Sequence, residues 1–205
     1  MSKLILARHG HVQGISPERF RGRAELPLTE LGRREAELTA QRIAASWQPA
    51  AIYTSPMSRA VDTGAAIGKP LGLSASAMPG LNDIDYGEWQ GLTNNEVRAR
   101  WADELDIWHR HPDWATIPRG ETLQQVLTRA VAALREVLRR HPDDTVVLVA
   151  HDSVNRVLLL HALELPLSRY WHFKQNPCCI NELDFGPDGF TILGINQTDH
   201  LQHAK

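Results

Sequence analysis

Residues 2–10 read SKLILARHG, and this stretch sets the interpretation of the whole chain. The mostly apolar run from Lys3 to Ala7 predicts a short β-strand. Arg8, His9 and Gly10 follow at the point where that strand ends. In an open α/β sheet, ligands bind at the carboxyl ends of the strands, so polar residues placed there are candidates for a functional site.

Two further predicted strands end in a similar way. The run TVVLVA, residues 145–150, is apolar and rich in valine, which is typical of a strand buried on both faces, and His151 and Asp152 follow it. The run AAIYTS, residues 50–55, is followed by a predicted helix with Arg59 at its start. Three strand ends therefore bring two arginines and two histidines toward one edge of the sheet.

Helices are expected between most of these strands. Thr29 is a plausible N-cap for the first of them, and Gly68 with Pro70 is expected to end the second. The predicted helices span residues 28–47, 58–68, 122–141 and 153–165, and a hairpin is expected over 179–196 across the turn at 186–189. This alternation predicts an α/β fold, a three-layer α/β/α sandwich with a mostly parallel sheet.

The chain is expected to form one domain over residues 1–205, because it contains no internal repeat and no long linker. Segment 84–120, rich in tryptophan, proline and charge, interrupts the alternation and is expected to be a small helical lid insertion.

The formal net charge is -2, so no basic excess favours nucleic acid as a partner. No run approaches the ~20 apolar residues of a membrane span, and the N-terminal apolar run is too short for a signal peptide. A cytoplasmic protein is therefore expected.

The two cysteines, Cys178 and Cys179, are adjacent and are expected to be reduced packing residues, as in a reducing compartment. No metal or other cofactor is expected, since no zinc-type spacing or carboxylate cluster occurs.

The residues at the strand ends favour a phosphoryl group as ligand. Arginine has a planar fork that matches phosphate geometry, and helix N-termini add backbone N–H donors. A single histidine or arginine at such a position is usually structural or solvated. Four of them at three strand ends favour a functional site.

A series of motifs then points to a family. In order, the chain reads LARHGHV, RFRGRAELPLTELGRREA, IYTSPMSRAVDTG, LNDIDYGEWQGLT, PRGET and VVLVAH. Together these resemble the histidine phosphatase superfamily, the phosphoglycerate-mutase-like group with an Arg-His-Gly signature, over nearly the whole chain. The resemblance implies that His9 is a nucleophile that forms a phosphohistidine, with backbone near Gly10 holding its ring. It also implies that Arg8, Arg59 and His151 bind the phosphoryl oxygens.

The resemblance further implies a carboxylic acid that protonates the leaving oxygen. Alignment on Gly87, Trp89 and Gly91 assigns this role to Asp83. Asp85 stays open as the alternative, and Glu88 is less favoured.

Two positions depart from the family pattern. Ile15 stands where many relatives have a phosphate-binding asparagine, so Arg21, Arg19 or a backbone N–H near Gly22 is expected to replace it. Asp152 stands where relatives often have glycine, and it adds negative charge unless it points away or pairs with Arg156. Arg21, Gly22 and Asp152 are thus candidate substrate-binding residues. The pocket wall is expected to include Arg21, Trp114, Arg119 and residues 171–177.

The favoured function is metal-independent hydrolysis of a small organic phosphate ester through a phosphohistidine. The alternatives are a cofactor-dependent phosphoglycerate mutase and a non-catalytic module that binds phosphate esters. The mutase is less favoured because residues 92–114, directly after Gly91, contain no Arg-Arg or Lys-Lys pair, and because no glycine-rich turn precedes the last strands. A homodimer, through the hairpin or the lid, is left open.

Overall fold

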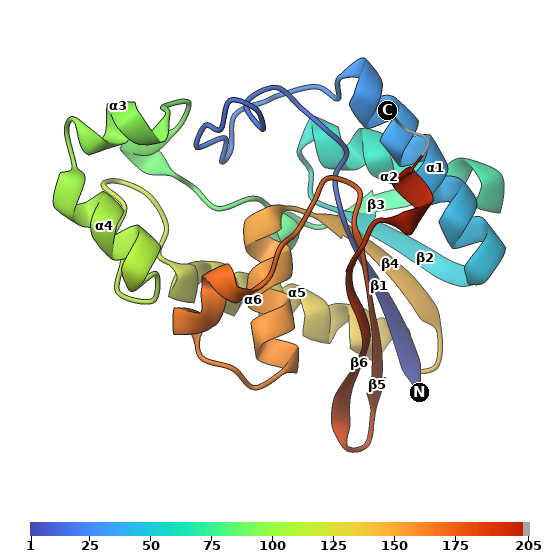
Figure 1. Ribbon diagram of the computed structural model, residues 1–205. Helices are drawn as coiled ribbons and strands as arrows, with labels where there is room; N and C mark the ends of the chain where they lie inside the picture. The colour runs from blue at the N-terminus through green and yellow to red at the C-terminus, as the bar shows by residue number, and fades with distance from the viewer. Residues whose placement is uncertain (203–205) are drawn as a thin grey trace.

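A computed structural model describes residues 1–202, and its centre is a six-stranded sheet with strand order β3-β2-β4-β1-β5-β6 (Figure 1). Four strands are parallel to one another: β1 (Ser2–Arg8), β2 (Pro49–Thr54), β3 (Ala75–Ala77) and β4 (Thr145–Ala150). The hairpin strands β5 (Ile180–Gly186) and β6 (Gly189–Gln197) are antiparallel, with β5 beside β1. The predicted mostly parallel sheet is confirmed.

Helices cover both faces of this sheet. The helices α1 (Glu30–Ser46) and α2 (Ser58–Leu71) pack on one face, where Ile43 and Ile67 meet Ile5, Ile52 and Val147. The helices α5 (Leu123–Arg140) and α6 (Asp152–Ala162) cover the other face and share a larger core with alternate residues of β1 and β4. Successive strand residues point to opposite faces, so the apolar runs supply both cores. The three-layer α/β/α fold is therefore confirmed.

Two helix ends can be compared with the residues that were expected to begin or end a helix. Thr29 is the N-cap of α1, and its side chain accepts a hydrogen bond from the Gly32 N–H at 3.1 Å. The expected end of the next helix at Gly68 is wrong, because α2 continues through Pro70 to Leu71. Gly72 ends it in the left-handed region at φ 66°, and its N–H donates to carbonyls of the last turn.

Segment 84–120 contains the short helices α3 (Asn94–Arg98) and α4 (Ala102–Arg110) and the 3-10 turn η2 (Gly87–Trp89). It lies to one side of the sheet, on the left of Figure 1. Its buried side chains Trp89, Leu105 and Trp108 belong to the same core as α5 and α6. The segment therefore packs on the main core. Three other short 3-10 turns are η1 (Pro79–Leu81), η3 (Leu167–His172) and η4 (Asp199–Leu201).

The loop after β1 lies directly on the N-terminus of α1. A Cβ atom at Gly10 would sit 2.4 Å from the Gly32 carbonyl oxygen, and one at Gly32 would sit 2.1 Å from the His11 carbonyl oxygen. Both approaches are too close for any side chain, so two facing glycines allow this contact.

Cys178 and Cys179 are free and fully buried, as predicted. Burial raises the pKa of both thiols, that of Cys179 to about 12. Their backbone holds the end of β1: the Cys178 N–H donates to the His9 carbonyl, and the Cys179 carbonyl accepts from the Arg8 N–H. Over residues 1–202, no helix is long and apolar enough to cross a membrane.

Candidate active site

The structure brings the four predicted residues of the strand ends together. His9 follows β1 and His151 follows β4, the neighbouring parallel strand, and their ring centroids are 5.1 Å apart. Arg8 is the last residue of β1, and Arg59 lies in the first turn of α2. All four are buried, and Arg59 and His151 are completely inaccessible to solvent. The four side chains therefore form one compact buried cluster with two arginines, called the phosphate pocket below after the ligand that the sequence leads us to expect there.

The hydrogen bonds of His9 define its tautomer. Arg59 Nε lies 3.2 Å from His9 Nε2, and an arginine nitrogen only donates, so Nε2 carries the lone pair. The proton is then on Nδ1, which donates to the Gly10 carbonyl at 2.7 Å. Burial, followed by the charges of His151, Arg8 and Arg59, holds the pKa of His9 well below its ordinary value. His9 is thus neutral, with Nε2 ready to attack an electrophile.

Arg59 connects His9 to the loop that contains Gly22 and Ala24. Its Nη2 donates to the Gly22 carbonyl at 2.7 Å and to Asp83 Oδ2 at 3.0 Å, and its Nη1 donates to the Ala24 carbonyl at 2.8 Å. Gly22 therefore contributes its backbone to the site, and its φ of 46° lies in the left-handed region that favours glycine. These contacts fix the guanidinium beside the nucleophile.

Asp83 reaches the phosphate pocket from the loop after η1. Its Oδ1 accepts from Ser153 Oγ at 2.6 Å and from the Ile84 N–H at 2.9 Å, and its Oδ2 lies 3.6 Å from His151 Nδ1. Burial alone would raise the pKa of Asp83, but His151, Arg59 and the Ser153 hydroxyl hold it below its ordinary value. Ser153 was not anticipated from the sequence, and its position in the first turn of α6 after His151 was the available signal.

Asp85, the alternative acid, lies elsewhere. Its Oδ1 accepts from the Gly87 N–H at 2.9 Å, and its Oδ2 is 3.5 Å from Arg23 Nη1. Asp85 is also absent from the lining of the cavity that lies in front of Asp83 and Ser153, which is described below.

Several buried polar atoms of the phosphate pocket have no hydrogen-bond partner among residues 1–202. They are both ring nitrogens of His151 and Nε of Arg8. The other end of the Arg8 side chain donates through Nη1 to the Gln175 carbonyl. Unpartnered buried polar atoms are costly, and a bound phosphoryl group would accept from Arg8 Nε and from the one ring nitrogen of His151 that carries a proton. Burial also lowers the pKa of His151, to about 3.

The two positions that depart from the family pattern make the following contacts. Both carboxylate oxygens of Asp152 accept from Arg156 Nε at 3.1 Å, so Asp152 pairs with Arg156, and Arg8 Nη1 is 3.9 Å away. Ile15 packs against an apolar cluster. Arg21 lines the cavity, and its guanidinium donates to the Gly14 carbonyl at 2.5 Å.

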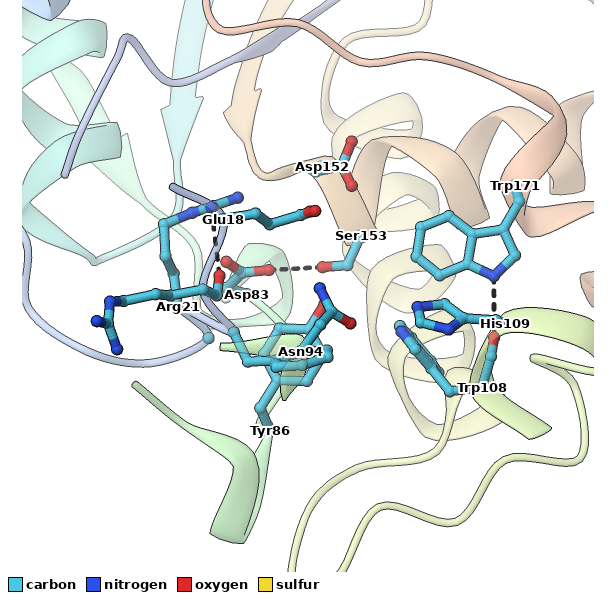
Figure 2. A pocket seen from close by; sticks show the side chains of 13 residues that line it. Glu18, Arg21, Asp83, Tyr86, Asn94, Trp108, His109, Asp152, Ser153 and Trp171 are labelled. Carbon is cyan, nitrogen blue, oxygen red and sulfur yellow. Dashed lines mark hydrogen bonds between the residues drawn. The ribbon is translucent and has the colours of Figure 1, made fainter. Parts of the chain in front are cut away.

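A cavity lies in front of Asp83 and Ser153, and Figure 2 shows the residues that line it. Trp171 and Trp108 form one side, joined by a hydrogen bond from Trp171 Nε1 to the Trp108 carbonyl at 2.9 Å. The expectation for Trp114 and Arg119 is wrong, because neither lines the cavity. Trp114 is 75% exposed and stacks on His111. The sequence did not point to five other lining residues: Glu18, Phe20, Tyr86, Asn94 and His109.

Within residues 1–202, no group of three or more His, Cys, Asp or Glu side chains is placed to hold a metal ion. Positive charge in the phosphate pocket comes from its own arginines.

Comparison with known proteins identifies relatives over the whole length. "Phosphoserine phosphatase 1" of Hydrogenobacter thermophilus is 30% identical over 98% of this chain and 95% of its own. A "2,3-bisphosphoglycerate-dependent phosphoglycerate mutase" of a Methylobacterium species is 35% identical over 77% of this chain and 78% of its own. Among solved structures, Bacillus stearothermophilus YhfR superposes with a TM-score of 0.93 at 27% identity, covering 98% of this chain and all of that chain. The profile of the histidine phosphatase superfamily (branch 1) matches residues 4–198. The chain belongs to the histidine phosphatase superfamily (branch 1).

Proposed function

We propose that this protein hydrolyses small organic phosphate monoesters through a phosphohistidine formed on His9. The observation that carries the proposal is the state of the His9 ring. Its Nδ1 proton is held by the Gly10 carbonyl and its Nε2 lone pair faces Arg59, so the ring is neutral and oriented as a nucleophile. The full-length similarity to a phosphatase supports the same class of reaction.

In the proposed reaction, Arg8, Arg59 and His151 bind the phosphoryl oxygens through the donors that are unpartnered or directed at His9 in the free protein. His9 Nε2 attacks phosphorus, a P–N bond forms and the P–O bond to the alcohol breaks. The leaving oxygen takes a proton from Asp83. Water, deprotonated by Asp83, then attacks the phosphohistidine, which releases inorganic phosphate and restores the free histidine. Atoms and charge balance without a metal ion.

Asp83 must be protonated for the first step, although its pKa is lowered in the free protein. A bound phosphoryl dianion would draw Arg59 and His151 away from the carboxylate and would add negative charge beside it. Both changes raise the pKa of a carboxyl group. Binding of the ester thus prepares the acid that the reaction requires.

The mutase is the second candidate, favoured by the mutase relative. Against it, a bisphosphate needs more cations than the cavity offers. Arg19 on the cavity wall lies 3.4 Å from Glu96, which leaves Arg21 as the one arginine of the wall without a carboxylate partner among residues 1–202.

The cytoplasmic location and a homodimer stay predictions of ours. The two reduced, buried cysteines support the former.

The test is release of inorganic phosphate, with EDTA present, from a panel that includes p-nitrophenyl phosphate and 3-phosphoglycerate. We expect hydrolysis by the natural sequence, loss of roughly 10⁴-fold or more in His9→Ala, and full activity in the control His111→Ala. Conversion of 3-phosphoglycerate to 2-phosphoglycerate only after addition of 2,3-bisphosphoglycerate would instead establish the mutase. Tight binding of the esters without turnover would establish a binding module.

A further inference from the structure

The segment that carries Asp83, residues 80–85, is called the acid loop below. It starts within η1 and lies directly against α5. A Cβ atom at Gly80 would sit 2.7 Å from Ala133 Cβ and 2.8 Å from the Arg129 carbonyl oxygen, so only glycine leaves room for this approach. The acid loop therefore meets α5 through its backbone.

Arg129, on α5, binds the backbone of the acid loop with its guanidinium. Its Nη1 donates to the Gly80 carbonyl at 3.0 Å and to the Asn82 carbonyl at 2.6 Å, and its Nη2 donates to the Asp83 carbonyl at 3.0 Å. Its Nε and Nη2 also donate to the Glu121 carboxylate, each at 2.9 Å. A guanidinium has five N–H groups, and these five hydrogen bonds use all of them.

Glu121 joins Arg129 to the far end of the acid loop. Its Oε2 accepts from the Asp85 N–H at 3.0 Å as well as from Arg129. Burial alone would raise the pKa of Glu121, but the hydrogen bonds from Arg129 and from the Asp85 N–H hold it below its ordinary value. The side chains of Glu121 and Arg129 are only 17% and 20% exposed. The two residues thus form a largely shielded ion pair that binds both ends of the acid loop.

This ion pair stands apart from the reacting groups. Neither Arg129 nor Glu121 lines the cavity, and the Asp83 carboxylate is bound by Ser153, Arg59 and the Ile84 N–H instead. The Arg129 charge does act at a distance: burial chiefly lowers the pKa of His151, and Arg129 is one of the smaller causes. Arg129 can therefore affect the reaction by its hold on the acid loop or by its charge, and an experiment has to separate the two.

We infer that Arg129, together with Glu121, is a positioning residue for the acid that protonates the leaving oxygen. It fixes the backbone on both sides of Asp83, so that the carboxylate stays within reach of the bond that breaks. The inference rests on the proposed function, in which Asp83 gives this proton. A displacement of about 1 Å caused by a mutation far from the chemistry can lower a rate about 10²-fold. The arginine fork reaches a carboxylate and three carbonyls at once, whereas lysine carries the same charge on a single nitrogen.

The test compares two esters whose leaving groups differ in their need for a proton. These are p-nitrophenyl phosphate, which needs none, and the alkyl phosphate that the natural sequence hydrolyses fastest. In Arg129→Met we expect kcat/KM per folded molecule to fall about thirtyfold or more for the alkyl phosphate and less than about threefold for p-nitrophenyl phosphate. Arg129→Lys should show the same selective loss, because it keeps the charge and lacks the fork. The control Arg135→Met, an exposed residue of α5, should change neither value.

Equal losses on the two esters, or none, would overturn the inference, since a merely structural role does not distinguish leaving groups. Full activity of Arg129→Lys on the alkyl phosphate would also overturn it, because charge alone would then be sufficient. Where Arg129→Met does not fold, Glu121→Gln repeats the comparison. It keeps the size of the side chain, and its selective loss on the alkyl phosphate should be about tenfold.

A double variant asks whether Arg129 acts through Asp83. In an Asp83→Asn background the acid is already absent, so Arg129→Met should lower kcat/KM for the alkyl phosphate by no more than about threefold further. A further loss as large as that in the natural background would overturn the inference.

Failure of the inference is distinguishable from failure of the proposed function. If the natural sequence hydrolyses no ester, the proposed function fails, and hydrogen exchange decides whether Arg129 holds Asp83 in place. The Ile84 N–H donates to the Asp83 carboxylate, and the Asp85 N–H donates to Glu121. Both amides should exchange about tenfold faster or more in Arg129→Met than in Arg135→Met. Equal exchange rates in the two variants would overturn the inference.

Discussion

The phosphate pocket and the cavity in front of it are built on different principles. In the phosphate pocket, Arg8, His9 and His151 come from the ends of adjacent parallel strands and are almost completely buried. In the cavity, Glu18 is an exposed residue of an irregular loop, and Asn94 begins a five-residue helix, with a buried side-chain oxygen that receives no hydrogen bond from residues 1–202. The topology of the sheet thus determines which bond is broken. The loop after β1 and segment 84–120 supply much of the cavity wall instead.

Arg59→Met should have the largest effect, because the Arg59 guanidinium donates to His9, to Asp83 and to two backbone carbonyls of the phosphate pocket. Removal leaves Asp83 Oδ2 and two backbone carbonyls without the arginine donor in a buried site. We expect the free energy of unfolding to fall by about 3–5 kcal/mol and kcat/KM to fall about 10³-fold. Urea unfolding and phosphate release measure the two, with Arg33→Met on the surface of α1 as control. Retention of both quantities would contradict this account of the pocket.

Asp83→Asn should come next and should sharpen the choice between the two acids. We expect kcat/KM, which reports only the steps through formation of the phosphohistidine, to fall about a hundredfold for an alkyl phosphate, whose leaving oxygen needs a proton. For p-nitrophenyl phosphate the loss should be much smaller, since nitrophenolate leaves without one. Asp85→Asn should retain activity on both esters. Equal losses on both esters in Asp83→Asn would mean that Asp83 acts in binding rather than as the acid.

Mild acid should destabilise the phosphate pocket while leaving His9 reactive. In the unfolded chain His9 and His151 titrate near pH 6.5, but burial holds both pKa values lower in the folded protein, that of His151 at about 3. The unfolded state therefore binds more protons below pH 6.5, and stability falls as pH falls from there toward the folded pKa values. Each histidine contributes about 1.4 kcal/mol per pH unit.

The midpoints of urea unfolding at pH 7.0 and 5.0 measure this decline in stability. The decline should be smaller in His151→Gln than in the natural sequence, and it should not be smaller in His111→Gln. Over this interval, kcat/KM per folded molecule should fall less than protonation of a histidine with an ordinary pKa of about 6.5 would make it fall.

Trp171→Phe should have the smallest effect, because it changes only the wall of the cavity. It removes the indole N–H that donates to the Trp108 carbonyl and joins η3 to α4. We expect KM to rise about two- to fivefold, the range for loss of one neutral hydrogen bond, with a smaller change in kcat. Steady-state kinetics with p-nitrophenyl phosphate measure both constants. A loss confined to kcat would place Trp171 in the chemistry rather than in the wall.

The same contrast explains what the sequence could predict. β1 and β4 were predictable because each is a short apolar run bounded by polar residues, and their parallel pairing then places His9 beside His151. The hydrogen bond between Thr29 and the Gly32 N–H is local, so its signal is local as well. Arg59 was predictable from its place after β2.

Arg21, Asp83, Asp152 and Trp171 were expected near the ligand and do line the cavity, but other lining residues were not predictable in this way. Ser153, Glu18 and Asn94 converge through the packing of segments far apart in the chain, and no periodic pattern marks such contacts. Trp114 shows the converse: a large aromatic side chain in the predicted lid is exposed and lies outside the cavity. The continuation of α2 through Pro70 likewise depends on its left-handed cap at Gly72.

The contact between Gly10 and Gly32 bears on how this protein tolerates mutation. Each glycine lies against a backbone carbonyl, so a methyl group at either position has no direction in which to move aside. No single compensating side-chain change relieves a clash with backbone. In a saturation library selected for activity, position 32 should therefore accept glycine alone, although it lies one element away from the nucleophile. A helix that touches no substrate would then be as intolerant of change as the catalytic histidine.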